Sequence, residues 1–210
     1  MSTLIYKNSE IEYEKDINNL SFESEESNSS LEISVDEIEE ILFNEPIYKI
    51  SESISKIFET LIVKNTNKRL QKFKENCLIE PFFTNQIPEI SIKDYLNRII
   101  YYTKIDENIL IMSLIYIDRL CIKNIPINIY SIYRILFACI LLSIKLNEDC
   151  IFKNSYYSII SGIPLQDLNL IEYNLLLIFD FKTNICINTF NKYKTALNGK
   201  ITSYISNLND

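Results

Sequence analysis

The chain of 210 residues contains no histidine and only two glycines, Gly162 and Gly199. The absence of histidine excludes Ser-His-Asp and Cys-His nucleophile systems and H-E-x-x-H metal sites. The shortage of glycine excludes Walker loops and G-x-G-x-x-G loops. Carboxylate pairs or an activated lysine remain as catalytic groups, but nothing gathers them at a recognisable site. The composition therefore argues against an enzyme with its own substrate and against a bound cofactor.

Cysteine is present without any ordered pattern. The five cysteines are scattered along the chain, and none is in C-x-x-C spacing. An odd number of cysteines favours reduced, mostly buried thiols over a disulfide framework. The absence of the spacing typical of metal ligands argues against a zinc site. These residues are Cys77, Cys121, Cys139, Cys150 and Cys186.

Positive charge is also in short supply. The formal net charge is -7, and the isoelectric point is near 4.8. Affinity for duplex nucleic acid comes largely from clustered lysine and arginine. The excess of acidic residues therefore argues against a nucleic-acid partner and suits a basic protein partner. The N-terminus, MSTLIYKNSEIEYEK, has no basic region followed by an apolar one. We therefore expect a cytoplasmic and/or nuclear protein.

The longest apolar stretch, ILFACILLSIKLNED over residues 135–149, ends on a single lysine. A membrane span needs about 20 apolar residues, and charged residues at positions 134 and 145 enclose a shorter run. We therefore predict a buried helix and no membrane partner. A helix without a polar face must be surrounded by other helices. The terminal Lys145 remains to be explained.

The chain is 47% hydrophobic, which suits one domain with appendages. Residues 1–48 are centred on the stretch SFESEESNSSLEISVDEIEE, in which serine and acid alternate with few aliphatics, so we expect a disordered tail. Ser29 and Ser34 each precede an acid by three residues, which makes them candidate sites for acid-directed kinases; an unmodified, solvated tail is the alternative.

Within the segment 49–80, apolar spacing predicts a helix from Ser51 to about Asn76, followed by a lead-in loop.

Five further helical segments follow, which predicts an all-α domain with one central helix wrapped by four. The first, second and fourth begin at residues suited to N-caps, and the fourth ends at a glycine. Proline suits the first turn of the fifth. The residues that delimit the helices are Ser91, Asp106, Pro126 with Asn128, Asn154, Gly162 and Pro164.

Three motifs within these segments resemble the cyclin box, most closely that of the P-type or U-type cyclins related to the yeast phosphate-signalling cyclins. They are I-S-I-x-x-Y-L-x-R-I from residue 90, Y-x-D-R-L from residue 116, and G-I-x-x-x-x-L-N-x-x-E from residue 162. The resemblance covers residues 82–193 and leaves 194–210 as a C-terminal extension. It implies a single five-helix cyclin box, preceded by an N-terminal helix, that binds and activates a cyclin-dependent kinase.

The resemblance also offers an explanation for Lys145. In cyclins, a lysine that ends the third box helix and a glutamate in the fifth reach the kinase backbone, and Lys145 and Glu172 stand at those positions. Taken without the resemblance, the same residues describe a lysine placed favourably at a helix C-terminus and an ordinary solvated glutamate. The resemblance favours the partner-binding interpretation.

Two other charged residues, Asp118 and Asp149, take roles from the resemblance. Asp118 matches an aspartate that ties box helices together, and we expect a buried or half-buried contact with Arg98 as a candidate partner. Asp149 matches an acid that, in phosphate-signalling cyclins, pairs with a kinase arginine that otherwise holds an activation-loop phosphate. An aspartate merely exposed in a loop is the alternative for Asp149.

Two differences from the cell-cycle cyclins narrow the expected function. The M-R-A-I-L patch with which cell-cycle cyclins dock substrates is not recognisable around residues 87–96, and the chain after Tyr193 is too short for a second box. The main prediction is a kinase regulator without metal, cofactor or small-molecule substrate. The alternatives are a non-activating scaffold that binds a kinase or another protein, and a DNA-binding box of the transcription-factor type, which the net charge opposes.

Overall fold

The computed structural model describes residues 46–65 and 77–208, and side chains within 47–63 and 77–199. The described residues all belong to one compact unit, residues 39–210. The candidate phosphorylation sites Ser29 and Ser34, and most of the expected tail 1–48, lie outside the described residues. Residues 66–76, where the predicted N-terminal helix was expected to end, also lie outside the described residues.

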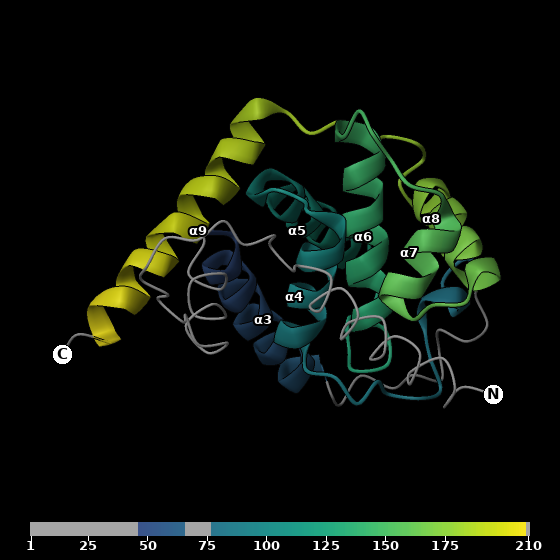
Figure 1. The fold of residues 1–210 in the computed structure, drawn as a ribbon, viewed down its shortest axis with the longest axis horizontal. Helices are drawn as coiled ribbons and strands as arrows, with labels where there is room; N and C mark the ends of the chain where they lie inside the picture. Colours follow the sequence, from purple (N-terminus) through teal and green to yellow (C-terminus); the bar gives the residue numbers. More distant parts are fainter. Residues whose placement is uncertain (1–45, 66–76, 209–210) are drawn as a thin grey trace, which may run out of the picture. The chain divides into compact units, whose positions relative to one another are not determined.

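All regular structure in the described residues is helical, which confirms the all-α prediction (Figure 1). A 20-residue helix precedes a short 3-10 turn and five helices, and a long helix follows them. The elements are α3 (Pro46–Asn65), η2 (Glu80–Phe82), α4 (Ile92–Thr103), α5 (Glu107–Ile122), α6 (Ile132–Asn147), α7 (Asn154–Ser161), α8 (Leu165–Ile178) and α9 (Ile187–Leu208).

Helix α6 is the buried helix expected from the apolar run. Every residue from Ile132 to Ile144 is buried except Arg134. The helix packs against α5 and α8, while α4 packs against α3 and α7. No described helix is long and apolar enough to cross a membrane. The hydrophobic core of the unit is therefore organised around α6.

Side-chain caps fix the starts of two helices as predicted. The Ser91 hydroxyl accepts a hydrogen bond from the Asp94 N–H at 3.0 Å, at the start of α4. The Asp106 carboxylate accepts one from the Ile109 N–H at 3.0 Å, at the start of α5. Each cap satisfies one backbone donor that the first helical turn leaves without a partner.

The boundaries of α7 and α8 differ in part from expectation. Gly162 ends α7 in the left-handed conformation with φ of 69°, as predicted. Asn154 does not cap α7: the cap position is Lys153, and the amide of Asn154 is bonded to side chains on α8. Pro164 stands just before α8 and not inside its first turn.

The cap at Ser91 provides a stability test. Replacing Ser91 with alanine should lower the free energy of unfolding by about 1 kcal/mol, because one donor of the first turn of α4 loses its acceptor. Ser53→Ala in α3 is the control, because among the described residues the Ser53 hydroxyl bonds only the Lys49 carbonyl oxygen, inside an existing helix. It should change the free energy by less than about 0.5 kcal/mol. Urea denaturation compares the variants, and equal losses would contradict the role of the cap.

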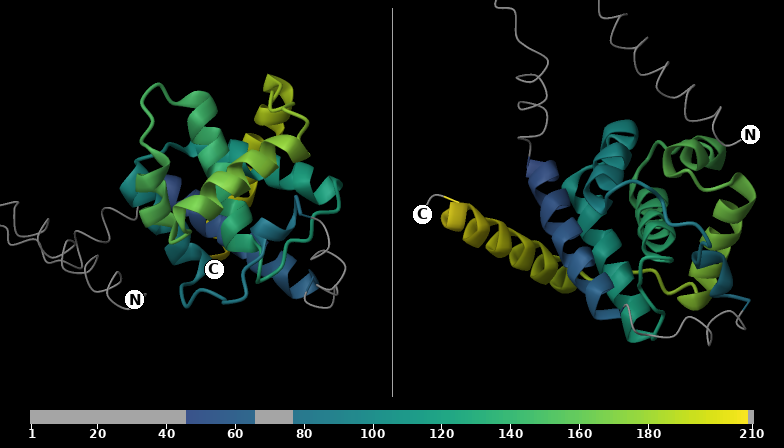
Figure 2. Two further views of the ribbon diagram at one scale, coloured as in Figure 1. Left: turned by 90° about the vertical axis from the view of Figure 1, so that its right-hand side faces the viewer. Right: turned by 90° about the horizontal axis from the view of Figure 1, so that it is seen from below.

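The first and last helices extend beyond the expected segments. Helix α3 begins at Pro46, before the predicted start at Ser51. Helix α9 runs through the boundary placed between residues 193 and 194, so the expected C-terminal extension continues a helix that begins at Ile187. Helices α3, α5 and α9 contact one another and lie side by side in two views (Figures 1 and 2).

The prediction that the cysteines are mostly buried is wrong. All five are free thiols, as expected, but only Cys139 in α6 is buried. Burial raises the pKa of the Cys139 thiol. Cys77, Cys150 and Cys186 lie in connections between helices, and Cys121 lies in the last turn of α5. The prediction rested on the fact that free cysteine is usually buried. The other four cysteines are exposed because they lie in connections or in the last turn of a helix.

Candidate partner-binding site

Lys145 and Glu172 form an ion pair between two helices. Lys145 lies in the last turn of α6 and Glu172 in the middle of α8. The distance between Nζ and Oε1 is 2.6 Å, and the side chains are 23% and 18% exposed. The C-terminal end of a helix favours a cation, and the aliphatic stem of lysine can cover apolar surface. The sequence thus brings together two residues that are 27 positions apart.

Asn154 completes this cluster from a third helix. Its side-chain amide donates to Oε2 of Glu172 at 2.8 Å and to Oδ1 of Asn169 at 2.7 Å. Both oxygens of Glu172 therefore have donors, which fixes the orientation of the carboxylate. Sequence reasoning did not identify Asn154 or Asn169 as members of the site. The spacing of Asn169 and Glu172, three residues apart on one helix face, was the available signal.

The ammonium group of Lys145 has capacity beyond this pair. An ammonium carries three N–H donors, and within the described residues only Glu172 accepts from it. Because Glu172 anchors the group and leaves it partly exposed, the remaining donors are available to backbone carbonyls of a bound protein. We call Lys145, Glu172, Asn154 and Asn169 the charged cluster.

Exposed apolar side chains flank the charged cluster along the chain. Leu146 follows Lys145, Tyr173 follows Glu172, and Ile151 and Phe152 precede Asn154; each is about half exposed. Phe152 is held against the ring of Tyr156, with ring centroids 4.4 Å apart. Exposed apolar groups around a few oriented polar groups are typical of protein-binding surfaces.

Asp149 lies in the connection between α6 and α7, and it is exposed. Among the described residues, no side chain or backbone group forms an ion pair or a hydrogen bond with its carboxylate, in contrast to that of Glu172. The structure thus places Asp149 four residues after Lys145, where it is free to meet a partner. Whether it does so stays a prediction.

Asp118 and Arg98 do not form the pair expected from the sequence. Arg98 on α4 donates to the Ile159 carbonyl oxygen of α7 at 3.1 Å. Asp118 on α5 is exposed, and it accepts a hydrogen bond from the Tyr193 hydroxyl of α9 at 2.8 Å. The pairing was wrong because the two residues face different neighbouring helices. The expectation of a buried or half-buried contact is also wrong, because Asp118 links α5 to α9 at the surface.

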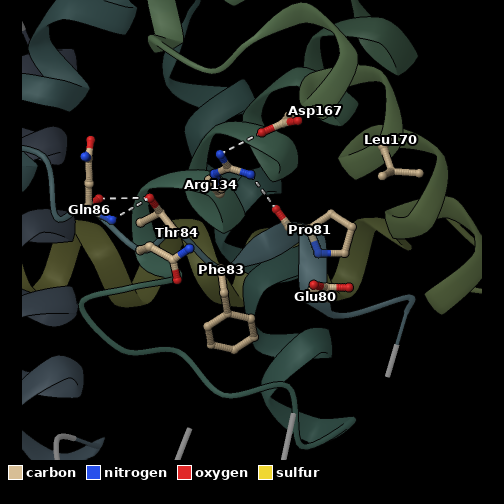
Figure 3. A pocket seen from close by; sticks show the side chains of 9 residues that line it. Glu80, Pro81, Phe83, Thr84, Gln86, Arg134, Asp167 and Leu170 are labelled. Atoms are coloured by element: carbon tan, nitrogen blue, oxygen red, sulfur yellow. Dashed lines mark hydrogen bonds and ion pairs between the residues drawn. The ribbon is translucent and has the colours of Figure 1, made fainter. Parts of the chain in front are cut away.

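A second polar arrangement, at the start of α6 and α8, is structural. Figure 3 shows Arg134 donating to the Pro81 carbonyl oxygen and to the Asp167 carboxylate, both at 2.8 Å. The guanidinium thereby joins η2 to α6 and α8 beside an open hollow of about 540 Å³. Among the described residues, no group of three or more His, Cys, Asp or Glu side chains is placed to hold a metal ion.

Comparison with known proteins gives the family. Residues 43–183 match the family described as Cyclin, a region that includes α3 and ends before α9. Cyclin-U4-2 of Arabidopsis thaliana is 30% identical over 158 residues, which are 73% of each chain. Cyclin-U4-3 of the same plant is 33% identical over 155 residues, 71% of this chain and 68% of that protein.

A third similar protein comes from another organism. PHO85 cyclin-like protein psl1 of Schizosaccharomyces pombe is 33% identical over 127 residues, 59% of this chain and 51% of that protein. The family match covers more than half of the chain and contains all members of the charged cluster. The chain therefore belongs to the cyclin family, as a cyclin of the P/U type.

Proposed function

We propose that this cyclin is a regulatory subunit that binds a cyclin-dependent serine/threonine kinase through the charged cluster and activates it. The observation that carries the proposal is the Lys145–Glu172 pair, which is oriented from three helices and retains donors for a partner. The name of the fission-yeast relative points to a kinase of the PHO85 type. Such a function uses no active site in the cyclin itself.

The charged cluster suits binding to a kinase backbone because it is oriented before the partner arrives. Glu172 holds the Lys145 ammonium at 2.6 Å, and Asn154 holds Glu172. Preorganisation of this kind reduces the entropy lost on binding. The exposed side chains Leu146 and Phe152 add apolar contact area beside the ammonium. The net charge of -7 favours the approach of a basic kinase surface.

Asp149 supplies the second half of the proposal. Its exposed carboxylate is offered to a kinase arginine that otherwise binds the phosphate of the activation loop. An arginine–carboxylate pair provides two parallel hydrogen bonds, which reproduces part of what a phosphate supplies. In this scheme the cyclin activates a kinase whose activation loop is not phosphorylated. We also propose the cytoplasm and/or the nucleus as the place where the cyclin acts.

Coexpression of the full chain with a PHO85-type kinase tests this function. The two proteins should purify as one complex, and transfer of phosphate to a serine/threonine peptide should increase about tenfold or more over the kinase alone, a barrier lowered by about 1.4 kcal/mol. Asp149→Asn should keep the complex and reduce the increase. Gln166→Ala, at an exposed position of α8, is the control and should match the unmodified chain.

Two outcomes would contradict the proposal in different ways. A complex without any gain in phosphate transfer would make the chain a non-activating scaffold. Failure to form a complex with any cyclin-dependent kinase, in affinity purification from cells that contain the full set, would contradict kinase binding itself.

A further inference from the structure

An apolar cavity lies between α3, α5 and α9, and these helices contribute nothing to the charged cluster. Its volume is about 350 Å³. Figures 1 and 2 show the three helices side by side, with α9 crossing beside α3 and α5. The walls are formed mainly by aliphatic and aromatic groups, among them Phe58, Leu61, Leu114, Ile117, Ala196 and Leu197. The volume falls at the lower end of the range of small-molecule sites, about 300 to 1,000 Å³.

One hydrogen-bonded pair, Asp118 and Tyr193, gives this cavity its polar group. The Tyr193 hydroxyl donates to Oδ2 of Asp118 at 2.8 Å. Burial and this hydrogen bond to a carboxylate raise the pKa of Tyr193 to about 12. The phenol therefore stays protonated at neutral pH and remains the donor to Asp118.

The second carboxylate oxygen of Asp118 is available to a ligand. Oδ2 is bound to Tyr193, whereas Oδ1 accepts no hydrogen bond from the described residues. Tyr193 restrains the carboxylate at the cavity without consuming its charge. No lysine or arginine lines the cavity, so nothing in the lining neutralises Asp118. This arrangement favours a cationic ligand group and opposes an anionic one.

We infer that this cavity binds a small organic amine, with an apolar body between α3, α5 and α9 and an ammonium group at Asp118. Burial of the apolar body supplies the driving force, and the carboxylate selects the charge of the head group. The site is independent of the proposed kinase function. Its test therefore uses the cyclin alone, and failure of either proposal leaves the other standing.

Three probes with the same phenylbutyl body test the assignment: 4-phenylbutylamine, 4-phenylbutanol and 4-phenylbutyrate. Chemical-shift titration of the isotope-labelled full chain measures the three dissociation constants. The amine should bind about fivefold more tightly than the alcohol, the upper end for an exposed charge pair. The butyrate should bind more weakly than the alcohol because its charge repels Asp118. The largest shifts should fall on residues of α3, α5 and α9.

Variants separate the charge from the cavity. Asp118→Asn keeps an acceptor for Tyr193 but removes the charge, so the amine should lose its advantage over the alcohol. Ala196→Phe, at an exposed position of α9, should fill the cavity and weaken all three probes at least tenfold. Leu61→Trp obstructs the opposite wall if the first variant folds poorly. Glu148→Gln is the matched control, because Glu148 is an exposed acid outside the cavity lining and outside the charged cluster, and it should leave all three affinities unchanged.

Several results would overturn the assignment. These are the absence of binding by all three probes, equal affinity for the amine and the butyrate, or an amine preference that survives Asp118→Asn. Unchanged binding in both cavity-filling variants would also overturn it, because the probes would then bind elsewhere. Thermal unfolding of each variant shows whether a lost affinity reflects a lost fold.

Discussion

Replacing Lys145 with alanine should weaken binding of the proposed kinase about 30-fold, or about 2 kcal/mol. The substitution removes the donors that the kinase carbonyls would otherwise bind, and it leaves Glu172 with a partner only on Oε2. The free energy of unfolding should fall by no more than about 1 kcal/mol, because the pair is partly exposed and Asn154 still holds the glutamate. Calorimetry with the purified kinase and urea denaturation of the free cyclin measure the two quantities.

Companion variants show whether Lys145 and Glu172 act as one unit. Glu172→Ala should weaken kinase binding by a similar factor, and the double variant should lose less than the sum of the two single losses. Lys182→Ala is the matched control, because Lys182 also pairs with a carboxylate at 2.6 Å but does so at a fully exposed turn. Unchanged affinity in both single variants would make Lys145 merely a lysine that suits the end of α6.

Leu142→Asp should abolish soluble folding. Leu142 lies in α6 and is 3% exposed. An aspartate there would place an unpaired carboxylate in the hydrophobic core, at a cost of several kcal/mol, comparable to the whole stability of a domain of this size. Circular dichroism and the soluble yield after expression measure the effect.

Leu146→Asp is the control for that variant. Leu146 belongs to the same helix, one turn further on, but it is 49% exposed. The same change of residue type should therefore leave the helical signal and the soluble yield nearly intact, within about 0.5 kcal/mol of stability. A well-folded Leu142→Asp protein would contradict the burial of α6 on all sides.

The fold was predictable where local chemistry decides the structure. An apolar run without a polar face implies a surrounded helix, and α6 is buried on all sides. Ser91 and Asp106 cap their helices because each side chain reaches a backbone N–H only three residues away. Gly162 ends α7 because glycine adopts the left-handed conformation without steric cost. The caps and the glycine stop depend only on residues nearby in the sequence, and the burial of α6 follows from its own apolar composition.

The errors arose where distant helices decide the outcome. Asn154 has the chemistry of a cap, but α8 offers its amide two acceptors, Asn169 and Glu172. Arg98 and Asp118 were matched by charge alone, whereas the packing of α4 on α7 and of α5 on α9 gives each a different partner. Lys145 and Glu172 were brought together by resemblance to cyclins. Helical spacing identifies the face on which a residue lies, but it does not identify the helix opposite that face.

The arrangement of Asn154, Glu172 and Lys145 has a consequence for how this sequence can diverge. Because the glutamate accepts from both other side chains, a change at position 172 removes the acceptor of Lys145 and one of the two acceptors of Asn154 at once. Drift at any one of these positions is then constrained by the other two, although 27 residues separate the outer members. In descendants of this chain, the three residues should therefore be kept together or replaced together, although they lie on three different helices.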